Sequence, residues 1–147
     1  MKKVDRLSRT SIVEHLAVEC ELSLQEFCTR LQTALNLPDF NFDGENRTEW
    51  GLVEVGYIEY NVSRPYASGV LQKWDKTVPL GCNFDVSLIV YREHLRAGDQ
   101  QWSFTNLVTP IGQIIADEFE VDVHYHRRWL GVGQNAERNV VFHPNAA

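Results

Sequence analysis

Residues 82–91 read CNFDVSLIVY and contain the clearest strand pattern in the chain. Apolar side chains occupy every second position between residues 84 and 90. A strand with this period presents one face to a core and the other face away from it. The pattern predicts a half-buried strand within a sheet. The inward side chains are Phe84, Val86, Leu88 and Val90, and the opposite side carries Asn83, Asp85, Ser87 and Ile89.

Further strands are expected on both sides of this segment. Residues 15–22 alternate in the same way, with Leu16, Val18, Cys20 and Leu22 on the apolar side. Residues 50–63 are rich in valine, isoleucine and tyrosine, and nearby glycines indicate turns or bulges, so a second long strand is expected there. Strand-like patterns also occur at 69–77, at 121–125 and at 139–143.

Two segments have the signals of helices. Ser23 and Glu26 form a capping box, and Pro38 prevents continuation, so a helix is expected over about 24–36. Thr109 before Pro110 has the pattern of an N-cap followed by proline in the first turn, which predicts a second helix that ends near residue 119. The apolar stripes are Leu24, Phe27, Cys28, Leu31 and Leu35 in the first helix, and Ile111, Ile114 and Ile115 in the second.

The order of these elements predicts the fold class. Strand, helix, several strands, helix and one or two strands lack the regular alternation of parallel α/β folds. We therefore expect an α+β fold in which a mainly antiparallel sheet is packed by two helices. Residues 1–147 are expected to form a single domain, with frayed ends at 1–10 and 143–147.

The composition of the chain makes a membrane protein or a nucleic-acid-binding protein an unfavourable interpretation. The chain has 147 residues, a net charge of −6, a pI near 5.3 and 44% hydrophobic residues. Its apolar runs are far shorter than the roughly 20 residues that span a bilayer, so no membrane association is expected. An acidic chain is a poor ligand for nucleic acid. Three cysteines cannot all pair and no secretion signal is apparent, which favours the cytoplasm.

Residues 39–44 resemble the opening of a calcium-binding EF-hand loop. Oxygen donors occur at Asp39, Asn41 and Asp43, and Gly44 follows. The twelfth position of such a loop should be a bidentate glutamate but is Trp50 here. An acidic turn is therefore the better interpretation, and no bound calcium is expected.

The other candidates for chemistry are incomplete. His124 and His126 would leave the same face of a strand together with Asp122, but zinc needs a third ligand that the sequence does not place. Residues 131–136 match G-x-G-x-x-A, yet too few residues follow for a dinucleotide-binding unit. Cys82 follows a glycine, where a thiolate paired with a distant histidine stays an alternative. No catalytic motif is complete, so no cofactor, metal or catalytic residue is assigned.

Negative charge is concentrated in two segments. Residues 39–60 contain six acids against one arginine, with aromatic residues among them, and residues 117–122 contain four more acids. Carboxylates that steer association and aromatic anchors that hold it are what a protein needs to capture a basic partner. The predicted partner-binding residues are Asp39, Asp43, Glu45, Glu49, Trp50, Glu54, Tyr57, Glu59, Asp117, Glu118 and Glu120.

Several segments together carry a resemblance to a known class of proteins. They are Leu31, Leu35, Leu37-Pro38-Asp39-Phe40, Asp43-Gly44-Glu45-Asn46 with Glu49-Trp50, Asn61-Val62-Ser63-Arg64-Pro65, Trp74-Asp75 and Pro79-Leu80-Gly81-Cys82-Asn83. With these segments the chain resembles the small, acidic immunity proteins encoded beside bacterial polymorphic or contact-dependent toxins. The resemblance implies a cytoplasmic inhibitor that covers the active site of a cognate toxin, commonly a nuclease, and is not an enzyme. The alternatives are a small metal-dependent hydrolase using His124 and His126, or an adaptor subunit with an exposed sheet edge.

Overall fold

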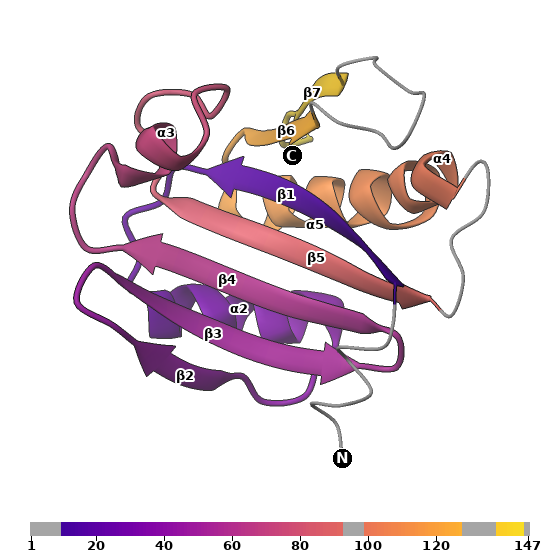
Figure 1. The fold of residues 1–147 in the computed structure, drawn as a ribbon, viewed down its shortest axis with the longest axis horizontal. Coiled ribbons are helices and arrows are strands. Elements are labelled where there is room, and N and C mark those ends of the chain that lie inside the picture. Colours follow the sequence, from indigo (N-terminus) through magenta and orange to yellow (C-terminus); the bar gives the residue numbers. More distant parts are fainter. Residues whose placement is uncertain (1–9, 93–98, 128–137, 146–147) are drawn as a thin grey trace.

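The computed structural model describes residues 10–92, 99–127 and 138–145, and it has the expected α+β fold (Figure 1). Seven antiparallel strands form one sheet in the order β2-β3-β4-β5-β1-β6-β7. The strands are β1 (Thr10–Val18), β2 (Asn41–Gly44), β3 (Thr48–Val55), β4 (Ile58–Pro65), β5 (Phe84–Arg92), β6 (Val123–Arg127) and β7 (Arg138–Phe142). The helical elements are α2 (Leu24–Leu35), α3 (Val70–Trp74), α4 (Asp99–Ser103), the π-helix η1 (Phe104–Val108) and α5 (Thr109–Phe119).

The central strand is β5, as its alternation suggests. All four inward side chains, from Phe84 to Val90, are fully buried. In the sheet, Val86 lies opposite Val62 of β4 and Leu16 of β1. The apolar sides of three neighbouring strands therefore form one continuous surface, which α2 and α5 cover (Figure 1).

Helix α2 begins and ends as predicted. The Ser23 hydroxyl accepts a hydrogen bond from the Glu26 amide at 3.2 Å, and the Glu26 carboxylate accepts one from the Ser23 amide at 3.1 Å. This is a complete capping box, which satisfies two amides that the helix leaves without partners. At the other end Asn36 adopts a left-handed conformation and terminates the helix before Pro38.

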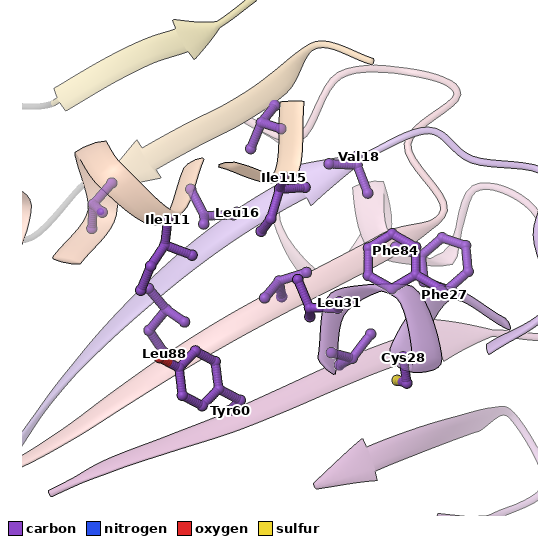
Figure 2. Close-up of a cluster of buried hydrophobic side chains, with 14 of the residues drawn as sticks. Leu16, Val18, Phe27, Cys28, Leu31, Tyr60, Phe84, Leu88, Ile111 and Ile115 are labelled. Atoms are coloured by element: carbon purple, nitrogen blue, oxygen red, sulfur yellow. The ribbon is translucent and has the colours of Figure 1, made fainter. Parts of the chain in front are cut away.

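Three stacked phenylalanine rings join the helices to the sheet. Phe27 of α2 stacks on Phe84 of β5, with 4.4 Å between the ring centroids (Figure 2). Phe27 also stacks on Phe119 of α5, with 4.3 Å between the ring centroids. The Arg30 guanidinium covers the outer side of Phe119, 4.7 Å from its centroid. Leu31 lies one turn after Phe27 in the same buried cluster and has no exposed surface.

Two extended segments differ from the prediction. Residues 50–63 are not one strand but two, because Gly56 in a left-handed conformation (φ 61°) turns the chain between β3 and β4. The strand expected at 15–22 ends at Val18. Beyond it, the Asn83 side chain bonds both the amide and the carbonyl of Cys20, at 2.9 and 2.8 Å, in place of a neighbouring strand.

Three other segments also differ between the sequence-based prediction and the structure. The segment 69–77 contains the short helix α3 instead of a strand, since Gly69 turns the chain with a φ of 82°. Strand β2 forms where an acidic turn was expected. Thr109 makes no capping bond, because it lies inside a helical stretch that continues from η1. Its amide donates to the Phe104 carbonyl, five residues back, directly before Pro110, which has no amide to donate.

The two strands that follow α5 are confirmed with small shifts. Strand β6 begins at Val123 and β7 begins at Arg138. The described part of the C-terminus is held in place, because Asn145 bonds Asp117 of α5 through both its amide and its side chain. The N-terminal residues 1–9 and residues 146–147 lie outside the described part of the chain. None of the described helices is long and apolar enough to cross a membrane.

Candidate functional site

The face of the sheet opposite α2 and α5 is the candidate site, because the long helices leave it uncovered (Figure 1). The register of four neighbouring strands places Asp43, Trp50, Ser63 and Asp85 in one row across this face. Their chain neighbours point to the opposite side of the sheet, as the alternation of a strand requires. This row therefore combines three polar side chains with the ring of Trp50 on the uncovered face.

Part of the predicted acidic surface lies on this face. Asp43 and Glu54 are exposed, and Trp50, half-buried, lies beside Asp43 on the neighbouring strand. Glu45 is exposed in the turn that joins β2 to β3. We call Asp43, Glu45, Trp50 and Glu54 the β2–β3 acidic face. It combines three carboxylates with one accessible aromatic ring.

Two predicted partner-binding residues, Glu49 and Glu59, do not contribute to this surface. Glu59 also points away from α2, but it is only 2% exposed, and the Tyr91 hydroxyl lies 3.4 Å from its carboxylate. Glu49 points toward the helices, where it forms an ion pair with Arg64 at 3.1 Å. The Glu59 carboxylate is therefore buried and the Glu49 carboxylate is paired within the chain, so neither belongs to the β2–β3 acidic face.

Two further predicted residues lie at the margins. Asp39 precedes β2 and accepts a hydrogen bond from the Gln32 side chain at 2.8 Å. Tyr57 is 48% exposed in the β3–β4 turn, and its ring centroid lies 6.3 Å from that of Trp102. Both are exposed, and the register places both toward the end of β3 at Val55.

The second acidic segment is not part of the same surface. Asp117 and Glu118 belong to α5, and Glu120 ends it, so all three lie on the helix side of the sheet. Hydrogen bonds from the Asn145 amide and then from Gln113 lower the pKa of Asp117. Glu118 pairs with Arg30 of α2 at 2.9 Å. Glu118 therefore joins α5 to α2, Asp117 joins α5 to the segment that follows β7, and Glu120 is exposed.

The histidine pair does not assemble a metal site within the described residues. His124 lies half-buried on the uncovered face, and the side chain of His126 lies outside the described part. Asp122 contacts His143 instead, with 2.8 Å between the carboxylate and Nδ1. Among residues 10–92, 99–127 and 138–145, no three histidine, cysteine or acidic side chains gather to hold a metal ion.

The remaining motifs give no site either. Residues 41–44 form β2, so the donors of the calcium-like run lie along a strand and do not encircle an ion. The glycine motif at 131–136 lies outside the described residues. Burial, assisted by the charge of Glu19, raises the pKa of the Cys82 thiol to about 11. A thiol with this pKa is protonated near neutral pH and is a weak nucleophile.

The uncovered face also carries a cluster of three polar side chains that the sequence pattern does not reveal. The Ser87 hydroxyl donates to Asp85 at 2.7 Å, and His15 Nδ1 lies 3.1 Å from that hydroxyl and 3.2 Å from the same Asp85 oxygen. These residues occupy the polar sides of two predicted strands, and a period-2 pattern does not show which polar side chains will be neighbours. The register of β1 against β5 places His15 opposite Ser87.

A second cluster is buried beneath the sheet. The carboxylate of Glu14 is 1% exposed and accepts hydrogen bonds from the Ser103 hydroxyl at 2.8 Å and the Tyr125 hydroxyl at 3.0 Å. Ser103 lies at the junction of α4 and η1. Buried charges need such partners to be tolerated. The cluster therefore ties β1, β6 and the helical stretch together.

No family model, curated protein or solved structure matches this chain. Similarity therefore adds no function to the residues described above. The geometry and the charge of the chain's own side chains are the basis for assignment.

Proposed function

We propose that this chain binds and neutralises a basic protein, in the way that an immunity protein neutralises its cognate toxin. The observation that carries the proposal is the β2–β3 acidic face, with Trp50 lying beside Asp43 on the side of the sheet that the long helices leave open. Carboxylates at the rim of an interface mainly accelerate association, whereas a central aromatic side chain mainly slows dissociation. The face offers both contributions.

The proposed setting is the cytoplasm. The three cysteines, Cys20, Cys28 and Cys82, are free, which suits a reducing compartment. A net charge of −6 suits a protein that must attract a basic partner and remain soluble. A nuclease is a fitting target class, because enzymes that bind nucleic acid present basic surfaces.

Charge reversal tests the role of the acids. Asp43→Lys combined with Glu45→Lys should slow association with the product of the neighbouring gene and reduce its dependence on salt. Glu19→Lys combined with Glu21→Lys is the matched control, since both residues are exposed, both follow β1 and lie outside β2 and β3, and the change in net charge is the same. Stopped-flow association at two salt concentrations compares the pairs. Equal association rates for the two double variants would remove this face from the interface.

Trp50 tests the aromatic anchor. Trp50→Ala should accelerate dissociation and weaken binding by about 2–4 kcal/mol, as for an interface hot spot. Thermal unfolding of the free protein should change much less, because the side chain points away from the core. A large loss of stability with unchanged dissociation would assign Trp50 to the fold instead. Failure of the neighbouring gene product to bind the wild-type protein at all would contradict the proposal.

A further inference from the structure

An open cavity of about 750 Å³ lies between the α3 segment and the uncovered face of the sheet. Helix α3 lies at the end of the sheet where β1 ends and β5 begins (Figure 1). Pockets of about 300–1,000 Å³ are the size that takes small organic ligands. The lining includes His15, Lys73, Trp74, Asp75, Lys76 and Asp85.

His15 is held in a fixed orientation at the sheet side of this cavity. Asp85 and Ser87 both contact Nδ1, so this nitrogen is occupied. Among the described residues Nε2 has no hydrogen-bond partner. The contact with Asp85 favours a proton on Nδ1, and it raises the pKa of His15 against the opposing effect of burial. The imidazole can therefore offer Nε2 to a ligand as a donor when it is protonated.

The α3 side of the cavity supplies positive charge and an aromatic ring. Lys73 and Lys76 both line it, and neither has an ion-pair partner among the described residues. Two of the four lysines of this acidic chain lie at this one cavity, where Asp75 and Asp85 balance their charge. Trp74 is 57% exposed, a large apolar surface for a ligand to cover.

The charges around His15 come from several elements. Asp85 on β5, Asp75 after α3 and Glu14 on β1 act on it as anions. Asp85 is engaged by His15 and Ser87, and Asp75 accepts hydrogen bonds from the Thr77 amide and hydroxyl. With His15 protonated, three cations and two anions line the cavity, which leaves a net positive charge.

We propose that this cavity binds a small organic phosphate that has a flat apolar group. The phosphate would contact His15 Nε2 and the two lysine ammonium groups, and the apolar group would pack on Trp74. Lysine is a common phosphate ligand, and a phosphate carries enough charge to use more than one cation. The site is distinct from the β2–β3 acidic face and does not depend on the protein-binding function.

Phenyl phosphate is the probe, with inorganic phosphate and phenol as its two parts. Titration is followed by NMR on the imidazole signals of the five histidines, with the His15→Gln variant assigning the His15 signal. We expect the His15 signal to shift most, and phenyl phosphate to bind about tenfold more tightly than either part alone. The unshifted histidine signals report that the fold is intact. No shift of His15 up to ~10 mM phenyl phosphate would overturn the proposal.

Variants distinguish specific binding in the cavity from non-specific electrostatic attraction of an anion to the protein surface. We expect two variants to bind phenyl phosphate about tenfold more weakly than the wild type. They are the single variant His15→Gln and the double variant Lys73→Gln with Lys76→Gln. Trp74→Ala should abolish the preference for phenyl phosphate over inorganic phosphate. Arg47→Gln is the matched control, because Arg47 is an exposed cation in the β2–β3 turn. Equal binding to the control and to the cavity variants would overturn the proposal.

One further variant tests the phosphate-binding proposal independently of the protein-binding proposal. Asp43→Lys combined with Glu45→Lys should leave phenyl phosphate binding unchanged, because neither residue lines the cavity. Loss of phosphate binding in that variant would contradict the assignment to the cavity. Absence of a protein partner would not affect the NMR result.

Discussion

Replacing Gly112 by alanine should destabilise the protein, although alanine is the better helix former. Gly112 lies inside α5, and its Cα faces the ring of Phe142 on β7. A Cβ at this position would lie 2.6 Å from Cδ2 and 2.7 Å from Cε2 of that ring. Carbon atoms do not approach so closely, so the ring or the helix must move.

The sign of the effect follows from two opposing magnitudes. Alanine in a helix interior is worth about 0.5–1 kcal/mol more than glycine. Forcing an extra carbon into a packed site costs about 1–3 kcal/mol. Phe142 is 8% exposed and packed against the core, so its ring has little room to turn away. We expect Gly112→Ala to lower the free energy of unfolding by about 1–2 kcal/mol.

Urea unfolding at 25 °C measures this change, and a double-mutant cycle with Phe142→Leu identifies its cause. Leucine lacks the ring atoms that the new Cβ would meet, so Gly112→Ala should cost much less in the Phe142→Leu background. The two substitutions should therefore be non-additive by about 1 kcal/mol. Stabilisation by Gly112→Ala in the wild-type background, at the value that helix propensity alone gives, would refute the close packing of α5 against β7.

Three further predictions concern the buried residues Leu31 and Glu14 and the histidine His15. Leu31→Ala should lower stability by about 2–5 kcal/mol in the same assay, because this side chain has no exposed surface; an unchanged midpoint would mean that the stripe faces a partner. Glu14→Gln should cost about 1–3 kcal/mol and be non-additive with Tyr125→Phe, whereas additive effects would contradict their hydrogen bond. The raised pKa of His15 means that the folded state binds this proton more tightly than the unfolded state. The stability that wild type has over His15→Gln should therefore be largest below pH ~6.5 and decline as pH rises through the folded-state pKa, and a difference that grows with pH would contradict the contact with Asp85.

The sequence by itself determined much of the local structure, because hydropathy alternation and helix caps act over only a few residues. The alternation at 84–90 and the capping box at Ser23 and Glu26 are short-range signals, and both elements formed where they predicted. Local signals worked less well where one backbone feature changed the outcome. Gly56 turned one expected strand into a hairpin, and Gly69 led into a helix where a strand was expected.

Only the tertiary structure decided which polar side chains share a surface. The register between strands is a long-range property, and a shift of one residue exchanges the two faces. It brought His15 of β1 beside Asp85 and Ser87 of β5, which are about seventy residues away in the chain. It also turned Glu49 toward the helices, where it pairs with Arg64, and left Asp43 on the opposite face, although both belong to one acidic segment. The sequence therefore determined which segments are acidic and which are strands, whereas the pairing of those strands determined which charges a ligand or a partner can reach.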